Sequence, residues 1–299
     1  MKILLFGKNG QLGWELQRSL APLGELVALC RHSTEFCGDL QRPDALADTV
    51  ERIAPDVIVN AAAYTAVDQA EAEPEIARAV NARAPALLAR LASERKAWLV
   101  HYSTDYVFNG GGDTPWRESC PTAPINVYGQ TKLEGEAAIQ DSGCRHLIFR
   151  TSWVYAARGG NFAKTMLRLG QERDTLTVID DQVGAPTGAD LLADVTAHAL
   201  RAAVREPALA GLYHLAAGGE TSWHGYAAFV LEQARAAGVE LKTAPGAVLP
   251  VDSSGFPTAA RRPLNSRLDT RKLQEAFGLH LPDWRVGVTR LLTEILDKT

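Results

Sequence analysis

An α/β fold built on a doubly wound parallel sheet is the fold class that this sequence predicts, on three observations. Short apolar runs alternate with amphipathic helical patterns over the first 150 residues. Continuous apolar runs are typical of strands that are buried on both faces of a parallel sheet. A glycine-rich segment separates the first run from the first helical pattern. Beyond about residue 150 the alternation stops, which predicts a smaller α/β region interleaved with the first.

The first half is expected to alternate strictly, because each apolar run is followed by a stretch of helical periodicity. Strands are expected at Ile3–Phe6, Leu26–Leu29, Val57–Val59, Trp98–Tyr102 and Leu147–Thr151. Helices are expected at Gln11–Leu20, Pro43–Ile53, Glu71–Leu91 and Val127–Ile139. Pro43 falls in the first turn of its helix, where its missing N–H leaves no bond unmade. Parallel strands joined in this way wind with right-handed crossovers into one sheet.

The second half mixes helices with loops rich in glycine and proline. Those loops are Asp180–Gly188 and Ala244–Pro263. Helical patterns cover Asn161–Glu172, Ala189–Arg205, Trp223–Ala237 and Trp284–Leu296, and a strand is expected at Leu212–Ala216. We expect some of these elements, at about 175–215 and 280–299, to return to the first sheet.

The bulk properties are those of an ordinary globular protein. The 299 residues are 46% hydrophobic and 22% charged, with a net charge of −4. That charge favours neither a nucleic acid nor an anionic membrane as a partner. The four cysteines, Cys30, Cys37, Cys120 and Cys144, form no CxxC pair. We therefore expect a reduced, cytoplasmic chain with no signal peptide or membrane span.

The glycine-rich segment Gly7–Gly13 has the spacing and context of a dinucleotide-binding turn. Gly7 allows the tight turn after the strand, and Gly10 lets the backbone approach a pyrophosphate. Gly13 lets the helix pack closely on the strand, and the helix N-terminus offers free N–H groups to phosphate. The segment predicts a Rossmann-type cofactor domain over residues 1–150 and a substrate-binding domain in the rest of 151–299. Its cofactor-contacting residues are expected to be Gly7, Asn9, Gly10, Gln11, Leu12 and Gly13.

The second strand ends without the carboxylate that usually binds the ribose of NAD. Arg31 stands there instead and could bind the 2′-phosphate of NADPH, although an ordinary solvated arginine is nearly as plausible from the sequence. The cofactor is thus NADPH or NADH. Further contacts are expected from Asp39 and Leu40 and from the small residues after the third strand. The latter are Ala61, Ala62 and Ala63, followed by Tyr64.

Tyr128 and Lys132 lie one turn apart at the start of a predicted helix, so they share a face. A nearby ammonium lowers the pKa of a tyrosine and fits it for acid–base work. Thr104 ends the fourth strand, where it could polarise a carbonyl oxygen. Ser103 competes for that role, because strand alternation points only one of the two into the site. Tyr128, Lys132 and Thr104 are the predicted catalytic residues.

These motifs together resemble the extended short-chain dehydrogenase/reductases, and within them the dTDP-4-dehydrorhamnose reductase family. Val80 and Asn81 resemble the superfamily's helix that carries an asparagine. Ala84-Pro85 stands where that helix often has Gly-Thr, which is a local departure. The narrower resemblance covers nearly the whole chain. Its segments are Val100–Phe108, Asn126–Lys132, Arg150–Tyr155, Asp181–Thr187 and Arg262–Ser266.

The resemblance implies reduction of the C4 ketone of dTDP-4-dehydro-L-rhamnose by NADPH or NADH. That is the last step of dTDP-L-rhamnose synthesis, which supplies cell-surface polysaccharide. Tyr128 would donate the proton, and Lys132 would tune Tyr128 and hold the cofactor ribose. Thr104 and Asp105 would contact the sugar, and Trp153 would form one wall of the sugar's pocket. Arg262 would pair with the phosphates of the nucleotide. Arg261 remains an alternative to Arg262, and a core tryptophan remains one for Trp153.

The resemblance also implies a homodimer and Mg²⁺. Glu15, Asp190 and Glu294 are the acidic candidates for the metal, although nothing in their spacing indicates a metal site. Two other functions stay open from the sequence. One is a reductase or epimerase of another nucleotide sugar, and the other is a regulatory subunit that kept the fold without turnover.

Overall fold

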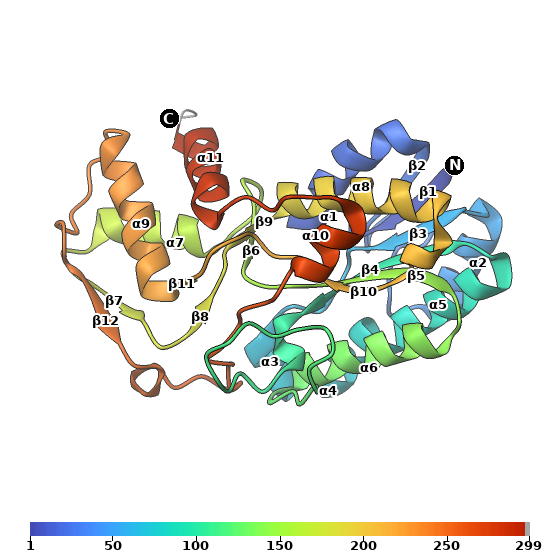
Figure 1. Cartoon of the computed structure of the whole chain (residues 1–299), viewed down its shortest axis with the longest axis horizontal. Coiled ribbons are helices and arrows are strands. Elements are labelled where there is room, and N and C mark those ends of the chain that lie inside the picture. The colour runs from blue at the N-terminus through green and yellow to red at the C-terminus, as the bar shows by residue number, and fades with distance from the viewer. Residues whose placement is uncertain (297–299) are drawn as a thin grey trace.

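The computed structural model describes residues 1–296 and is built on a six-stranded parallel sheet (Figure 1). The strand order is β10-β5-β4-β3-β1-β2. The strands are β1 (Lys2–Phe6), β2 (Glu25–Leu29), β3 (Val57–Asn60), β4 (Trp98–Thr104), β5 (Arg145–Thr151) and β10 (Gly211–His214). The chain order reverses between β1 and β3, so loops after these strands part there and leave room for a ligand. The predicted doubly wound α/β fold is confirmed.

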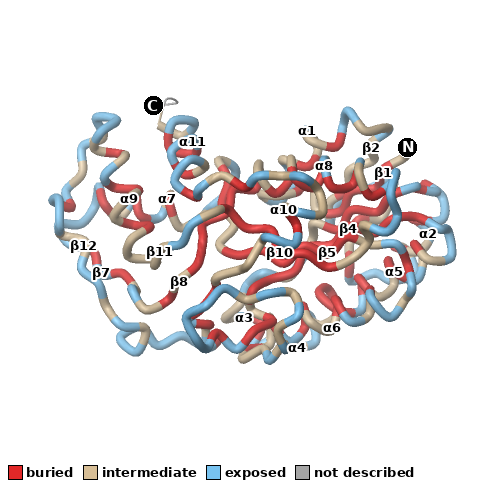
Figure 2. Tube along the Cα trace, viewed as in Figure 1, coloured by how far each residue is buried: buried red, intermediate tan, exposed pale blue. Residues whose placement is uncertain are grey.

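Helices cover both faces of the sheet and bury two separate apolar layers. On one face lie α1 (Gln11–Leu20), α8 (Ala189–Arg205) and α10 (Arg271–Phe277). On the other lie α2 (Pro43–Ile53), α5 (Ala84–Arg95) and α6 (Val127–Asp141) (Figure 1). The central strand β4 is buried along its whole length, as the continuous red trace shows (Figure 2). Its first residues contribute to both apolar layers, with Trp98 and Val100 in one and Leu99 in the other, as expected for a central parallel strand.

The remaining elements form a second region with a core of its own. Its helices are α7 (Phe162–Glu172), α9 (Trp223–Ala236) and α11 (Trp284–Leu296), which gather at one end of the molecule (Figure 1). Short strand pairs link them: β7 (Leu176–Ile179) with β12 (Val248–Val251), β8 (Val183–Gly184) with β11 (Thr221–Ser222), and β6 (Val154–Tyr155) with β9 (Thr187–Gly188). Trp284 and Tyr226 are among its most deeply buried side chains.

Some elements expected to return to the main sheet do so, and others pack elsewhere. β10 forms the edge of the main sheet, and α8 packs on α1. By contrast, β7 pairs with β12, and α11 packs on α9 in the second region. The division into a cofactor domain and a substrate domain stays a prediction, and residues 297–299 of the expected returning stretch lie outside the described residues.

The helix expected at Glu71–Leu91 is several helices. α3 (Val67–Ala72) ends before Glu73, because Pro74 follows and pushes the preceding residue out of helical geometry. α4 (Pro74–Arg78) then runs into a π-helical turn, η2 (Ala79–Arg83), and on into α5. Single π-turns inside helices are rare and gather at functional sites.

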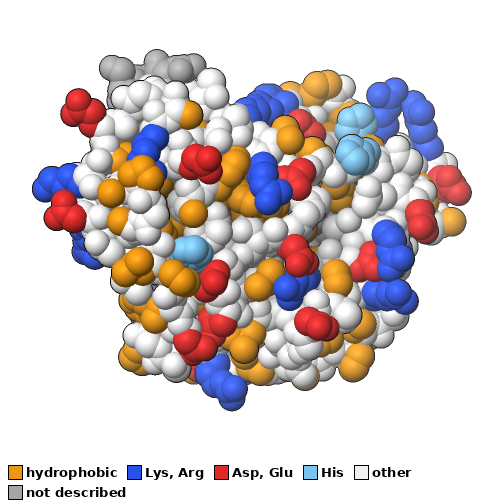
Figure 3. Space-filling view, turned by 60° about the vertical axis from the view of Figure 1, so that its left-hand side comes forward, with side chains coloured by type: hydrophobic (Ala, Val, Ile, Leu, Met, Phe, Trp, Pro, Cys, Tyr) orange, Lys and Arg blue, Asp and Glu red, His pale blue; other side chains and the backbone are white. Residues whose placement is uncertain are grey.

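Within residues 1–296, no helix has the length and apolarity to cross a bilayer. All four cysteines are free, with Cys144 buried and the others partly exposed. On the face shown in Figure 3, basic and acidic side chains are interspersed with apolar ones rather than gathered by sign.

Candidate active site

One large cavity lies where the glycine turn, the ends of β3 and β4 and the start of α6 meet. Its volume is about 850 Å³. The predicted cofactor residues that line it are Gly7, Asn9, Gly10, Gln11, Leu12, Arg31, Ala61, Ala62, Ala63, Tyr128 and Lys132. The predicted substrate residues that line it are Thr104, Asp105, Tyr128 and Trp153. The cavity thus joins both groups in one space.

The three glycines of the turn meet three different steric demands. Gly7 has φ +90°, and a Cβ there would lie 2.8 Å from the Ala62 nitrogen. A Cβ on Gly13 would lie 2.0 Å from the carbonyl oxygen of Gly7, so the helix can pack on the turn only with glycine there. A Cβ on Gly10 would meet its nearest atom at 3.4 Å, an ordinary contact. The protein itself therefore tolerates a side chain at Gly10.

Gly10 caps α1 without a side-chain hydrogen bond to the first turn. The first N–H groups of a helix have no partner within the helix, and together with the helix dipole they attract phosphate. Because the space over Gly10 opens into the cavity, the turn fits a pyrophosphate. We find here the geometry that the spacing of the glycines predicts.

The predicted residues at the far end of this cavity are only partly brought together. Arg31 lines it beside Cys30 and His32, and the Arg31 Nε lies 3.7 Å from Asp39 Oδ1. Asp39 itself does not line the cavity, and Leu40 is buried in the core under α2. The prediction that these two residues contact the cofactor therefore finds no support in their positions.

Tyr64 also lies outside the cavity lining. Its hydroxyl donates to Glu73 Oε2 at 2.7 Å, and its backbone N–H donates to Asn81 Oδ1 at 2.9 Å. Gly13 lies behind the turn rather than on its surface. Tyr64 was predicted from its position after β3, and Gly13 from the glycine pattern. In the structure both residues contact neighbouring parts of the protein and do not line the cavity.

Tyr128 begins α6, where Asn126 caps the helix by accepting from the Gly129 N–H at 2.7 Å. Burial raises the pKa of Tyr128 to about 12, and a hydrogen bond with Thr104 offsets part of that rise. Thr104 accepts from the Tyr106 N–H and donates to Asp105 Oδ1, both at 3.1 Å. Ser103 lines the cavity as well, and its Oγ is buried without a hydrogen-bond partner among the described residues. The expectation that only one of the two hydroxyls faces the site stays a prediction.

Asp105 is a buried carboxylic acid beside these hydroxyls. Burial raises its pKa to about 7, and the hydroxyls of Ser266 and Thr104 offset only part of that effect. Its Oδ2 is buried without a hydrogen-bond partner among the described residues. Unpaired buried oxygens are rare in folded proteins, which makes this one a candidate ligand contact.

Lys132 is buried, and its ammonium contacts groups other than Tyr128. Its Nζ donates to the Tyr102 carbonyl at 2.5 Å and lies 3.2 Å from His101 Nε2. Burial lowers the pKa of Lys132 to about 8, although Glu136 acts to raise it. The expectation that Lys132 lowers the pKa of Tyr128 is therefore not met in this structure, where burial of the phenol dominates.

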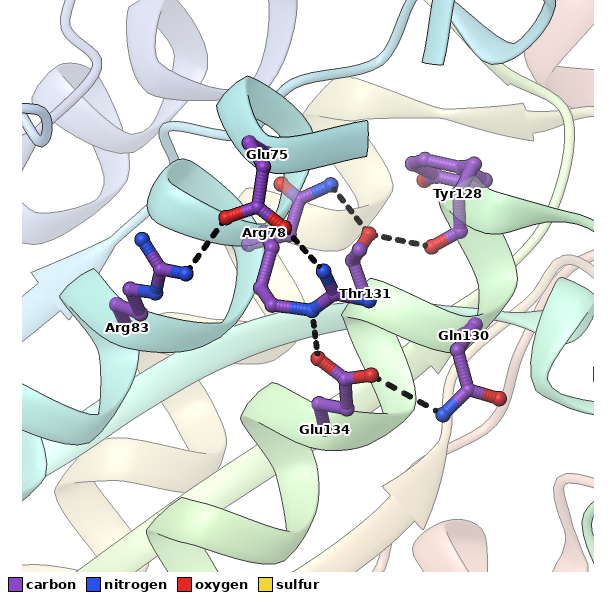
Figure 4. A network of polar contacts seen from close by, with 8 residues as sticks. Glu75, Arg78, Arg83, Tyr128, Gln130, Thr131 and Glu134 are labelled. Atoms are coloured by element: carbon purple, nitrogen blue, oxygen red, sulfur yellow. Dashed lines mark hydrogen bonds and ion pairs between the residues drawn. The ribbon is translucent and has the colours of Figure 1, made fainter. Parts of the chain in front are cut away.

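A polar network fixes α6 against the π-helical turn (Figure 4). Asn81 donates to Thr131 Oγ1 at 3.2 Å, and Thr131 donates to the Tyr128 carbonyl at 3.0 Å. Arg78 joins Glu134 at 2.9 Å and Glu75 at 2.7 Å. The start of α6, and with it Tyr128, is thereby held against α4 and the π-helical turn.

Trp153 forms part of the cavity wall together with a residue that the sequence did not indicate, Trp223. The two indoles stack with their ring centroids 3.7 Å apart. Trp153 has φ +49°, a conformation uncommon outside glycine and one that gathers at functional sites. Trp223 comes from the start of α9, and its Nε1 donates to Gln182 Oε1 at 3.2 Å. No local pattern at Trp223 could have revealed this partnership.

A second cavity, of about 680 Å³, adjoins the first through Tyr106 and Trp223, which line both. Arg262 and Arg261 line the second cavity and not the first. The guanidinium of Arg262 grips the carboxylate of Asp68, with contacts of 2.6 Å and 3.1 Å. This pair ties the late loop to α3 across the mouth of the site.

The three predicted metal ligands do not form a metal centre. Asp190 pairs with Arg290 at 3.1 Å and Glu15 with Arg18 at 3.5 Å. Among residues 1–296, which include Glu294, no group of three or more acidic, histidine or cysteine side chains is placed to hold a metal ion. Their selection rested on a resemblance alone.

The fold and the site together define a Rossmann-type α/β protein with one large cavity at the carboxyl edge of its parallel sheet. The model of the RmlD substrate binding domain family matches residues 1–296, and the chain belongs to that family. The chain is 61% identical, over all of its length and 99% of the relative's, to a dTDP-4-dehydrorhamnose reductase of Shigella flexneri. The family resemblance predicted from the motifs is thus confirmed.

Two solved structures are similar over nearly their whole length. A dTDP-4-dehydrorhamnose reductase from Clostridium acetobutylicum has a TM-score of 0.89 at 32% identity, covering 99% of this chain and 100% of that one. Its counterpart from Bacillus anthracis, in complex with NADP, has a TM-score of 0.86 at 34% identity, covering 98% and 99%.

Proposed function

We propose that this protein reduces the C4 ketone of dTDP-4-dehydro-L-rhamnose to give dTDP-L-rhamnose, with NADPH or NADH as the reductant. The observation that carries the proposal is the single cavity in which Tyr128 and Thr104 stand beside the open glycine turn. The family membership and the relatives' printed activity support the choice of substrate.

When bound, the reduced nicotinamide supplies a hydride to the C4 carbon of the sugar. Tyr128 donates its phenolic proton to the C4 oxygen as negative charge develops there. Its raised pKa keeps the phenol protonated and ready to donate at neutral pH. Thr104, which is hydrogen-bonded to Tyr128, orients the same oxygen. Asp105, buried beside Thr104, contacts a sugar hydroxyl through its unpaired Oδ2.

Lys132 holds the nicotinamide ribose from beneath. Its Nζ lies at the inner wall of the cavity beside the Tyr102 carbonyl and His101, and it has one further N–H to offer. A bound ribose would bring hydroxyl oxygens to that donor. Tyr128 and Lys132 would then be coupled through the ribose rather than by direct contact.

The nucleotide half of the substrate occupies the second cavity. Trp153 and Trp223 offer apolar walls between the two cavities, and Arg262 stands in the second. A guanidinium suits phosphate oxygens, which could compete with Asp68 for Arg262. Arg261 lines the same space and is the alternative phosphate ligand.

The test is cofactor oxidation, followed at 340 nm, with the sugar nucleotide made freshly from its epimerase. The purified protein is expected to consume NADPH or NADH only when dTDP-4-dehydro-L-rhamnose is present. Turnover on a different 4-keto sugar nucleotide, and none on this one, would identify another reductase of the superfamily. Tight cofactor binding without turnover on any of them would identify a regulatory subunit. Both outcomes would overturn the proposal.

Arg31 gives the site a preference for NADPH over NADH in our proposal. No carboxylate ends β2, and the guanidinium of Arg31 lines the cavity with His32. Arg31→Ala is expected to raise the KM for NADPH about tenfold, consistent with loss of one charged phosphate contact of about 1.4 kcal/mol, and to leave the KM for NADH unchanged. An equal rise in the KM for both cofactors, or an NADH preference in the unaltered protein, would contradict the proposed role of Arg31.

We retain the homodimer and magnesium as proposals that rest on the family resemblance. Light scattering with and without a chelator separates them, because a dimer that persists without metal supports the first and not the second. A cytoplasmic enzyme that supplies rhamnose for O-antigen or a similar surface polysaccharide is the corresponding expectation in the cell.

A further inference from the structure

A buried polar chain links Lys132 to the loop that follows β3. His101 lies on β4 and is 1% exposed, and its Nε2 lies 3.2 Å from Lys132 Nζ. Its Nδ1 lies 3.2 Å from Asn60 Nδ2, on the neighbouring strand β3. Asn60 in turn accepts the Ala62 N–H with its Oδ1 at 3.2 Å. The chain thus ends on the loop that lines the cofactor cavity.

The hydrogens along this chain can be counted. Because the Ala62 N–H can only donate, Asn60 must present its oxygen there and its NH₂ to His101. The Nδ1 of His101 must then accept, which places the single proton of a neutral imidazole on Nε2. That Nε2–H points at Lys132. It is satisfied only if Lys132 offers a lone pair, as a neutral amine does.

A charged Lys132 demands the opposite arrangement. An ammonium only donates, so His101 Nε2 would have to accept and the proton would move to Nδ1. That N–H would then meet the NH₂ of Asn60, and a buried mispaired donor is costly. Each proton state of Lys132 is therefore matched to one tautomer of His101.

The other groups around Lys132 do not remove this coupling. On α6, Glu136 lies one turn beyond Lys132 and Tyr128 one turn before it. Glu136 is neutralised by Arg150 of β5, at 2.6 Å. On β4, Tyr102 contributes only its carbonyl, because its hydroxyl bonds Thr196. Burial and the neighbouring Lys132 lower the pKa of His101 well below its usual value, so His101 itself stays neutral.

We propose that His101, oriented by Asn60, is a positioning residue that sets the proton state of Lys132 and so the readiness of the Tyr128–Lys132 pair. The proposal rests on the proposed role of Lys132 in turnover. The neutral amine and the Nε2–H imidazole are the matched state above the titration of Lys132, and cofactor oxygens that reach Lys132 favour its charged state.

The first measurement is the tautomer of His101 in the whole protein, from long-range ¹H–¹⁵N NMR correlations. Above the titration of Lys132, His101 is expected as the Nε2–H form. An Nδ1–H form at every pH would overturn the proposal. This measurement needs neither substrate nor turnover.

The decisive variant is Asn60→Asp, which keeps the shape and the acceptor for the Ala62 N–H. Its carboxylate accepts an Nδ1–H, so His101 can accept from a charged Lys132. The Lys132 titration, followed through its ¹³Cε shift, is expected to move up by at least about one pH unit, a tenfold change in the equilibrium. The alkaline limb of the kcat/KM profile should move with it.

A double-mutant cycle separates transmission through His101 from the direct field of the new carboxylate. In the His101→Gln background, Asn60→Asp is expected to shift Lys132 by much less. An equal shift in both backgrounds would overturn the proposal. If either variant fails to fold, the tautomer in the unaltered protein still decides.

The matched control is His214→Gln. His214 is also fully buried, but it lies on β10, two strands from β4, with its Nδ1 facing the Trp116 carbonyl at 3.0 Å. This change should leave the Lys132 titration in place. Near-normal turnover of Lys132→Met would refute the proposed role of Lys132 in turnover, and it would do so independently of the tautomer result.

Discussion

The two regions of the molecule build their parts of the site by different means. In the sheet region, the side chains stand at strand ends and at the first turn of a helix. Thr104 ends β4 and Tyr128 begins α6, and both are fixed by capping hydrogen bonds. In the second region, the walls come from an indole stack and from a loop held by the Arg262–Asp68 ion pair. The sheet region thus holds the residues that we propose for the chemistry, and the second region holds those that we propose for recognition of the nucleotide.

The comparison assigns different consequences to mutations in the two regions. Changes in the sheet region should alter kcat, cofactor binding or the fold itself. Changes in the second region should alter KM for the sugar nucleotide and leave the cofactor's affinity in place. Four tests examine this division.

The largest effect is expected from Tyr128→Phe. It removes the only hydroxyl proposed to protonate the C4 oxygen and leaves the helix and its cap intact. We expect kcat to fall by about 10²- to 10⁴-fold with little change in the Kd for NADPH. Steady-state kinetics and a fluorescence titration of the cofactor measure the two quantities. A kcat close to that of the unaltered enzyme would remove Tyr128 as the acid.

The glycine turn offers a matched pair of substitutions. Gly13→Ala forces a Cβ to within 2.0 Å of the Gly7 carbonyl oxygen, so we expect a loss of about 3 kcal/mol or more in the free energy of unfolding. Gly10→Ala meets no atom closer than 3.4 Å, so the fold should survive while NADPH binding weakens at least about tenfold. Denaturant unfolding and calorimetric binding distinguish the two. Unchanged cofactor affinity in Gly10→Ala would show that the phosphates lie elsewhere.

Asp105 predicts a pH-dependent stability. Its pKa in the folded protein is about 7, above the value of about 3.8 expected when unfolded, so the folded state binds the extra proton between those pH values. This group's contribution to stability is therefore present at low pH and lost as the pH rises through about 7. Asp105→Asn should stabilise the protein at pH 8 by about 2 kcal/mol and have little effect at pH 4. Unfolding curves of both proteins at the two pH values measure this difference in the free energy of unfolding. A variant that is stabilised at pH 4 and not at pH 8 would contradict the prediction.

The smallest effect is expected from Arg262→Gln in the second region. Loss of the guanidinium opens the contact with Asp68 and removes a proposed phosphate ligand. The KM for the sugar nucleotide should rise about tenfold, with kcat and the KM for NADPH changing less than threefold. Arg261→Gln is the matched control. A larger effect from Arg261 than from Arg262 would exchange their roles.

The sequence predicted the sheet region well because its elements are determined locally. Short apolar runs marked β1 and the first half of β4, and glycine spacing marked the turn at Gly7. The one helix predicted wrongly there, Glu71–Leu91, failed at Pro74, whose effect on the preceding residue breaks the helical pattern.

The second region was harder, because its contacts join segments that are distant in sequence. Trp153 stacks on Trp223, and β7 pairs with β12, through no local pattern. The same reason explains why the direct contacts of Lys132 were not predicted. Residue spacing placed it beside Tyr128, but only the fold brings His101 and the Tyr102 carbonyl to its ammonium.

The strand order of the sheet has a consequence for synthesis on the ribosome. β5 gains its outer partner only when β10 has been made, roughly 60 residues later in the chain. At bacterial elongation rates the nascent chain spends on the order of several seconds with the polar edge of β5 unpaired. An open edge can pair with another chain, so this interval is when a growing chain is most exposed to aggregation. Slower translation between β5 and β10 should therefore lower the yield of folded protein, even though the finished sheet is unchanged.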